Sequence, residues 1–141
     1  MRCEELMKRD VECVSPQATA QAAAQRMREQ QIGFLPVCDE SQKVLGTVTD
    51  RDLAVRILAD ARAPTTPVGE VLTREVVACR PEDDLRKAQE LMGRNHKSRI
   101  MCVDGEDRLV GVISLSDIAQ KENGAKASQT LRKVSEREAR A

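Results

Sequence analysis

The segment Gly46-Thr47-Val48-Thr49-Asp50-Arg51-Asp52 decides the fold, because its pattern returns 65 positions later as Gly111-Val112-Ile113-Ser114-Leu115-Ser116-Asp117. Each copy has a glycine, a hydroxyl residue three positions on, and an aspartate three positions after that. The first half of each copy continues an aliphatic, strand-like run, and the second half opens a helical pattern. The motif is therefore expected at a strand-to-helix junction that the chain makes twice.

The two halves of the chain align around this motif without a gap. Identical residues meet at the same spacing in the pairs Pro16/Pro81, Ala23/Ala88, Met27/Met92, Asp39/Asp104 and Ala54/Ala119. The unit is longer than a solenoid repeat and occurs only twice, which favours a closed pair over an open array. We predict units over residues 1–62 and 68–123, a linker over 63–67, and a polar tail over 124–141.

Each unit has the periodicity of helix, strand, helix, strand, strand, helix, so the fold class is α+β. The expected elements are lead-in helices around residues 3–7 and 68–72, short strands at 11–14 and 76–79, helices from 20 and 85, strand pairs at 34–38 with 44–49 and 99–103 with 109–114, and final helices at 50–60 and 115–122, the last ended by Asn123-Gly124. A unit of ~60 residues buries little surface alone, so the units should pack about a pseudo-twofold axis. The tail is open to three interpretations: a frayed helix, a partner-docked helix or disorder.

Composition narrows the functional class. The 141 residues hold 23 basic and 23 acidic side chains, one Phe and no Trp or Tyr. Neither the basic excess nor the stacking residues of a nucleic-acid binder are present. No aliphatic run approaches the ~18 residues of a membrane span, and the opening residues have no apolar signal region, so a cytoplasmic protein is expected. No base and nucleophile with a positioning third group can be assembled, which argues against an enzyme.

The repeated motif itself has two interpretations. Hydroxyl-x-x-acid is the capping-box pattern, with Thr49 or Ser114 as the N-cap residue. Capping does not require Gly46 or Gly111, however, and a glycine there lets either a ligand or another backbone approach the strand.

Two units of this layout, each ending in Gly-x-x-Ser/Thr-x-x-Asp, resemble a tandem pair of cystathionine-β-synthase (CBS) domains, or Bateman module. The resemblance covers about residues 1–122 and includes Leu35-Pro36-Val37-x-Asp39 and Val103-Asp104. It implies a stand-alone regulatory sensor that needs no cofactor for chemistry and binds AMP, ADP, ATP, NAD or S-adenosylmethionine in clefts between the units. It also implies a homodimer paired through its helices, and a regulatory target that the sequence does not identify.

The resemblance assigns roles to particular residues. Asp52 and Asp117 would accept hydrogen bonds from ribose hydroxyls, as a carboxylate with spare acceptors does in dinucleotide-binding folds. Thr49 and Ser114 would add a polar contact, and the base would lie near Val14 to Thr19 or near 79–84. The candidates for phosphate binding are Arg51, Lys97 and Arg99. The acids Glu82, Asp83 and Asp84 would repel phosphates at the second site, which ranks Asp52 ahead of Asp117.

Each of these assignments has a plainer alternative. The acids at 82–84 complement a helix dipole, and Arg51 and Lys97 are equally well explained as solvated surface charges. The whole module could be a homodimeric interaction module with vestigial ligand sites, or a cysteine-based redox or metal sensor.

The cysteines and the histidine give little support to the last alternative. Cys13, Cys38, Cys79 and Cys102 fall on strands and are typical of small buried side chains, with a Cys13–Cys38 disulfide as the other interpretation. His96, the single histidine, has no partner at metal-ligand spacing, so no metal site is predicted.

Overall fold

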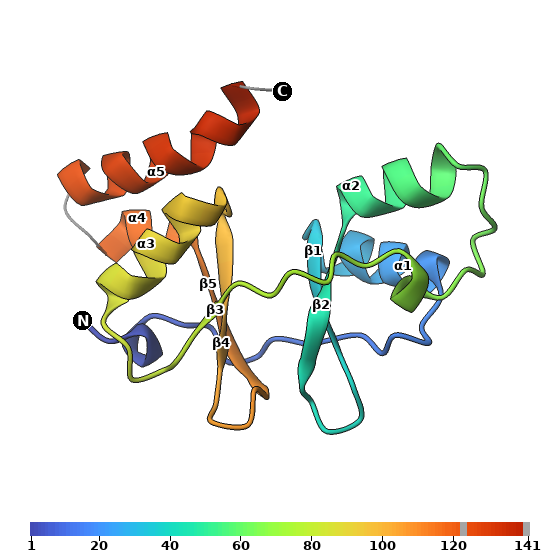
Figure 1. The fold of residues 1–141 in the computed structure, drawn as a ribbon, viewed down its shortest axis with the longest axis horizontal. Coiled ribbons are helices and arrows are strands. Elements are labelled where there is room, and N and C mark those ends of the chain that lie inside the picture. Colours follow the sequence, from blue (N-terminus) through green and yellow to red (C-terminus); the bar gives the residue numbers. More distant parts are fainter. Residues whose placement is uncertain (122–123, 140–141) are drawn as a thin grey trace. The chain divides into compact units, whose positions relative to one another are not determined.

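The computed structural model describes residues 1–121 and 124–139, with side chains over 1–121 and 128–136. Its helices and strands form two compact α+β units (Figure 1). We name them by their motif aspartates: the Asp52 unit is Glu12–Val76, and the Asp117 unit is Met1–Val11 together with Val77–Ala141. None of the described helices combines the length and apolar character needed to cross a membrane.

The Asp52 unit is built on the antiparallel strands β1 (Phe34–Cys38) and β2 (Val44–Thr49). Val14 adds a parallel bridge on β1 and Thr73 an antiparallel bridge on β2. Helix α1 (Ala20–Gln30) begins where the Thr19 side chain accepts a hydrogen bond from the Ala22 N–H. After β2 come α2 (Asp50–Asp52), the π-helix η2 (Leu53–Leu58) and the 3₁₀ turn η3 (Val68–Glu70). The core is aliphatic, and its buried members are Val14, Ala23, Met27, Leu35, Val37, Val48, Val68 and Leu72.

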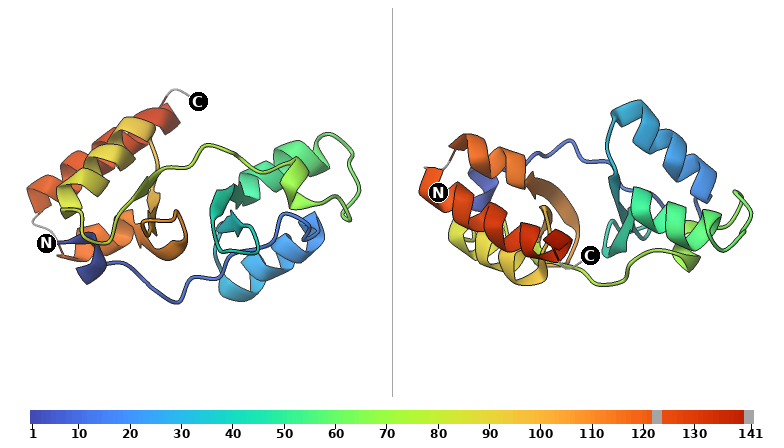
Figure 2. Two further views of the ribbon diagram at one scale, coloured as in Figure 1. Left: turned by 60° about the horizontal axis from the view of Figure 1, so that its bottom comes forward. Right: turned by 90° about the horizontal axis from the view of Figure 1, so that it is seen from above.

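The Asp117 unit repeats this plan. Strand β3 (Ala78–Cys79) runs parallel to β4 (Arg99–Val103), which pairs antiparallel with β5 (Leu109–Ser114). The 3₁₀ turn η1 (Cys3–Glu5) precedes Lys8, which bridges Val112 of β5. Helices α3 (Leu85–Asn95) and α4 (Leu115–Lys121) complete the repeated part. Helix α5 (Gly124–Ala139) has no counterpart in the Asp52 unit and packs on α3 and α4 (Figure 2).

The compact units differ from the sequence repeats because the lead-in segments are exchanged. Lys8 and Val112 exchange two backbone hydrogen bonds of 2.9 and 3.0 Å, and Thr73 and Thr47 exchange two of 2.9 and 2.8 Å. Each segment therefore extends the sheet of the other repeat. The periodicity of the sequence shows which segments are alike. Backbone pairing at the sheet edges determines which of the two repeats each lead-in segment joins.

Most expected elements are confirmed, and three kinds are wrong in detail. The four long strands have the predicted bounds, and α1 and α3 lie where their apolar stripes indicate. The lead-in helices are single 3₁₀ turns, the strand at 76–79 shrinks to Ala78–Cys79, and that at 11–14 shrinks to a bridge at Val14. The helix at 50–60 is one α-turn followed by π-helix. Asn123, predicted to end the last helix, lies outside the described residues. Gly124 begins α5, so the described part of the tail is a helix.

Candidate functional site

The Thr49–Asp52 pair forms a capping box at the start of α2. The Thr49 N–H donates to Asp52 Oδ2 over 3.0 Å, and the Asp52 N–H donates to Thr49 Oγ1 over 3.1 Å. Two of the N–H groups that a helix start leaves without partners are thereby satisfied. The capping interpretation is confirmed for this copy.

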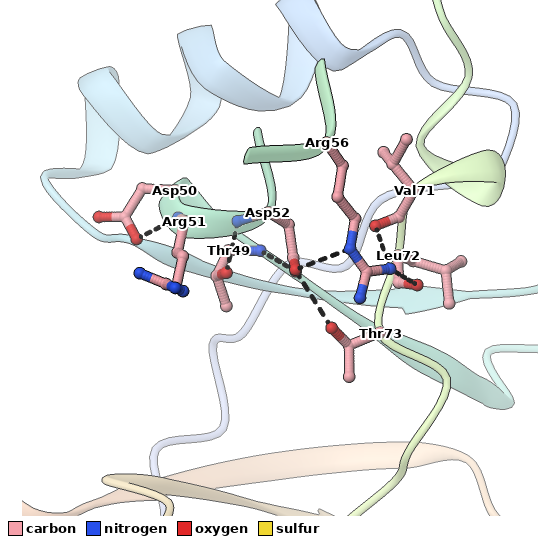
Figure 3. A network of polar contacts seen from close by, with 8 residues as sticks. All are labelled: Thr49, Asp50, Arg51, Asp52, Arg56, Val71, Leu72 and Thr73. Carbon is pink, nitrogen blue, oxygen red and sulfur yellow. Dashed lines mark hydrogen bonds and ion pairs between the residues drawn. The ribbon is translucent and has the colours of Figure 1, made fainter. Parts of the chain in front are cut away.

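Two further groups reach the same carboxylate. The Thr73 hydroxyl donates to Asp52 at 3.2 Å from Oδ1 and 3.3 Å from Oδ2, and Arg56 Nε lies 3.8 Å from Oδ1 (Figure 3). Arg56 also donates from Nη1 to the carbonyls of Val71 and Leu72, at 3.2 Å each. Asp52 is only 8% exposed. Its carboxylate therefore joins the helix start to the lead-in segment, and both oxygens are engaged.

The glycine of the motif has a structural reason in each unit. A Cβ on Gly46 would lie 2.2 Å from the Thr73 carbonyl oxygen, and a Cβ on Gly111 would lie 2.7 Å from Met7 Sδ. Of the two interpretations left open by the sequence, the described contacts support close approach by another part of the chain. Glycine is what lets the exchanged segments pair with β2 and β5.

The Asp117 site repeats the cap but changes what lies beyond it. The Ser114 N–H donates to Asp117 Oδ2 over 3.0 Å, and the Asp117 N–H donates to Ser114 Oγ over 3.1 Å. Lys8 occupies the repeat position of Thr73 and places Nζ 3.5 Å from Asp117 Oδ1. The Lys8 side chain is 69% exposed. Oδ1 of Asp117 thus faces an exposed ammonium group, whereas the Asp52 carboxylate accepts from a hydroxyl.

The residues expected to bind phosphate lie in different surroundings. Arg51 extends away from the Asp52 carboxylate (Figure 3), and its backbone N–H donates to Asp50 Oδ1 over 2.8 Å. Arg99 is the cross-strand partner of Ser114, and both line a pocket of about 510 Å³. Lys97 is half-buried and its backbone N–H donates to the Met92 carbonyl over 2.9 Å. The structure brings Arg99 to Ser114, and it turns Arg51 away from Asp52.

The residues expected near the base have structural tasks. Val14 is buried in the core, accepts from the Cys38 N–H over 3.0 Å and donates to the Pro36 carbonyl over 2.9 Å. Thr19 caps α1 through its hydroxyl, which lies 3.0 Å from the Ala22 nitrogen.

The acids at 82–84 also serve the fold. Asp84 is the N-cap of α3, and the Arg86 N–H that it accepts lowers the pKa of its carboxyl. Asp83 accepts from the Arg80 N–H over 2.8 Å. These contacts support helix-start complementation as the role of the acids.

All five cysteines are free thiols. Cys38, Cys79 and Cys102 are buried as expected, but Cys13 is only half-buried and lies 3.1 Å from Gln42 Oε1. The Cys13–Cys38 disulfide is absent. The Asp117 unit instead holds a thiol cluster that the sequence did not reveal: Cys79 Sγ lies 3.6 Å from Cys3 Sγ and 3.5 Å from Cys102 Sγ.

Across the described residues, no three His, Cys, Asp or Glu side chains lie close enough together to hold a metal ion. The residues that the sequence interpretation missed are Thr73, Lys8 and Arg56. A signal existed for each: Lys8 and Thr73 share one repeat position, and Arg56 stands four residues after Asp52, where helical side chains meet.

A family model for the CBS domain matches residues 3–59 and 68–124. The chain belongs to the CBS domain family. It is 37% identical over 116 residues to the CBS domain-containing protein YhcV of Bacillus subtilis, covering 82% of this chain and 81% of the relative. It is 36% identical over 118 residues to hypoxic response protein 1 of Mycobacterium tuberculosis, with the same coverages of 82% and 81%. The tandem CBS pair predicted from the repeated motif is thus confirmed.

One solved structure adds a ligand to this comparison. The CBS domain pair of protein MJ0100, in complex with 5′-methylthioadenosine and S-adenosyl-L-methionine, matches with a TM-score of 0.75 at 22% identity. The match covers 85% of this chain and 94% of that one. At this identity the likeness shows that the two share a fold.

Proposed function

We propose that this CBS domain pair is a regulatory module without catalytic chemistry, and that it binds an adenosine-type ligand through the ribose hydroxyls at a motif carboxylate. The observation that carries the proposal is the divided use of the Asp117 carboxylate. Oδ2 is committed to the cap, whereas Oδ1 faces the exposed ammonium of Lys8. A carboxylate oxygen has two acceptor positions, so Oδ1 retains capacity for a hydroxyl donor. The adenosine compounds bound by the MJ0100 pair support the same ligand class.

The contacts favour Asp117 over Asp52, the reverse of the order that the acids at 82–84 suggested. A ribose at Asp52 must displace the Thr73 hydroxyl, and exchanging one hydroxyl donor for another gains little. A ribose at Asp117 displaces no hydroxyl, and Lys8 stays within reach of a phosphate. Arg99 and Ser114 line a neighbouring pocket in the same unit. We therefore propose Asp117, Ser114, Lys8 and Arg99 as the first site, and Thr49 with Asp52 as the second.

The test is calorimetric titration with AMP, ADP, ATP, NAD and S-adenosylmethionine. At least one should bind, and Asp117→Ala should weaken it about ten- to a hundredfold, because charge-assisted hydrogen bonds are worth about 1.5–3 kcal/mol. A 2′-deoxy ligand should bind wild type more weakly, yet lose little further affinity in Asp117→Ala. Asp52→Ala is the matched control and should retain most of the affinity. Failure of all five compounds at millimolar concentration would reject the sensor.

One observation favours a second role as a homodimeric interaction module. Leu58 is 79% exposed and Val55 is 47% exposed, both on η2 of the Asp52 unit. Sedimentation should give about twice the 15.6 kDa of one chain, and Leu58→Glu should return the mass to one chain. A wild-type mass of one chain at tens of micromolar, with nucleotide binding intact, would remove the dimer and leave the sensor.

A further inference from the structure

A pocket of about 540 Å³ lies in the groove between α3 and α5 of the Asp117 unit, where the two helices run side by side (Figure 2). Its lining does not include Ser114 or Asp117, so it is separate from the motif site. Gly93 permits the close approach of α5, since a Cβ there would lie 3.2 Å from Lys133 Cβ. The volume is within the range of small-molecule sites.

The groove contains an unsatisfied hydrogen-bond donor. Gln89 lines the pocket, and its Nε2 is buried without a hydrogen-bond partner among the described residues. Buried polar groups nearly always have partners, because an unpaired one carries the full cost of its desolvation. A ligand oxygen in the groove would supply the acceptor that Gln89 lacks.

The rest of the lining has three basic side chains, Arg86, Arg94 and Lys133, against two acidic ones. Arg94 and Lys133 have no ion pair or side-chain hydrogen bond with any side chain that the structure describes, whereas Arg86 pairs with Asp84 at 3.3 Å. The opposing acids are Glu90 and Glu136. The C-terminal dipole of α3 also opposes an anion, but the Met92 and Gly93 carbonyls already accept from the N–H groups of Lys97 and His96. Because three basic side chains stand against two acidic ones, the lining has a net formal charge of +1 with His96 neutral, which favours an anionic ligand.

His96 is joined to α5 by a hydrogen bond. Its Nδ1 lies 2.9 Å from the Lys133 carbonyl oxygen. A carbonyl only accepts, so Nδ1 is the donor. The imidazole lines the pocket and is the single histidine of the chain.

The repeat shows that these donors are particular to one unit. At the positions of Arg86, Gln89, Arg94 and His96, the first repeat has Gln21, Ala24, Glu29 and Gln31. The shared fold does not require the second set, since the same helix forms in both units. The first repeat thus provides natural replacement residues for a test.

We propose that the α3–α5 groove binds a small organic anion bearing phosphate or carboxylate groups. Its charged oxygens contact Arg94 and Lys133, one oxygen accepts from Gln89 Nε2, and the His96 ring borders the site. This site is independent of the ribose site at Asp117.

The experiment follows the His96 ring protons by NMR at constant pH during a titration with inorganic pyrophosphate or citrate. Either anion should shift these resonances saturably, because His96 lines the groove that the anion would occupy. Arg94→Glu and Gln89→Ala, which copy the first repeat, should abolish the saturable shift. Sodium chloride at equal ionic strength should not produce it.

Lys87→Ala is the matched control, since Lys87 lies on the exposed side of α3, pairs with Asp83 and does not line the groove. It should leave the pyrophosphate effect intact, as should Asp117→Ala. An equal effect of sodium chloride, an equal loss in Lys87→Ala, or no saturable shift of the His96 ring resonances with either probe would overturn the proposal.

Discussion

The Asp52 and Asp117 units share one cap and differ in the residue that the lead-in segment places against it. In the Asp52 unit a hydroxyl, a guanidinium and one backbone N–H surround the carboxylate, and a π-helix follows. In the Asp117 unit the outer oxygen meets only an exposed ammonium among the described contacts, and a regular α-helix follows. The same motif therefore has both carboxylate oxygens engaged within the fold in one copy, and one oxygen that meets only an exposed side chain in the other.

Substitutions of the motif glycines should reveal the largest difference in stability between the two units. Gly46→Ala places a methyl group 2.2 Å from a backbone oxygen, and Gly111→Ala meets the flexible side chain of Met7. Because backbone yields less than a thioether side chain, we expect losses of about 3 kcal/mol at Gly46 and about 1 kcal/mol at Gly111. Urea unfolding followed by far-UV circular dichroism measures both. Equal losses of unfolding free energy in the two variants would mean that the two lead-in segments tolerate a methyl group equally well.

Removing each motif carboxylate compares the two sites directly. Asp52→Ala removes a cap, leaves the Thr73 hydroxyl without its acceptor and deprives Arg56 of its ion-pair partner, so we expect a loss of about 2–3 kcal/mol. Asp117→Ala removes a cap and an exposed ion pair, for a loss of about 1 kcal/mol. Urea midpoints at neutral pH test the order. Thr49→Ala and Ser114→Ala serve as controls, because they remove the capping hydroxyl and leave the carboxylate in place.

Alkaline pH should weaken the Asp117 unit through its thiol cluster. The hydrogen bond with Cys102 raises the pKa of Cys79 to about 12, and that with Cys79 raises the pKa of Cys3 further still. Raised folded-state values mean that the stability is complete below the unfolded pKa of about 8.5 and is lost as the pH rises toward 12. The Cys79 and Cys3 thiols should each contribute a slope of about 1.4 kcal/mol per pH unit.

Cys79→Ala supplies the control for this slope. The substitution opens a cavity and so lowers the free energy of unfolding at neutral pH. The decrease of that free energy with rising pH should become less steep, by the contribution of about one titrating thiol. Urea unfolding between pH 8 and 10 measures the slope. An unchanged slope in Cys79→Ala would show that other groups cause the decline.

The sequence predicted the parts of the fold that depend on local pattern. The periodicity of side chains reports local structure. It therefore revealed the 65-residue repeat, the strand pairs and the apolar faces of α1 and α3. The exchange of lead-in segments was not, because Lys8 pairs with Val112 across more than 100 positions through backbone groups that every residue has. The π-helix after Asp52 was not predicted for the same reason. Its backbone hydrogen bond from the Ala59 N–H to the Ala54 carbonyl does not change the spacing of apolar side chains detectably over two turns.

The candidate site was predictable in its cap and not in its surroundings. Thr49 with Asp52 and Ser114 with Asp117 are separated by three residues, and such pairs meet whenever a helix starts there. Arg51 adjoins Asp52 in sequence yet extends away from it, whereas Thr73 is 21 positions distant and donates to its carboxylate. Proximity in the chain is a poor guide to proximity at a helix start, where successive side chains diverge.

The smallest expected effects come from substitutions of Thr73 and Lys8, the lead-in residues that make the two carboxylate sites differ. Thr73→Val removes one buried hydroxyl donor and should cost about 1 kcal/mol. Lys8→Met removes an exposed ion pair and should cost no more than about 0.5 kcal/mol, vanishing at high salt. Urea unfolding at low and high ionic strength separates the two, because the loss of stability in Thr73→Val should persist in salt.

Ligand binding gives a second measurement, in which the two variants should change affinity in opposite directions. Thr73→Val frees the acceptor and should strengthen adenosine binding at Asp52, whereas Lys8→Met should weaken binding of phosphorylated ligands at Asp117. If Thr73→Val leaves binding at Asp52 unchanged, the hydroxyl does not compete with ribose, and the difference between the two units must then come from Arg56.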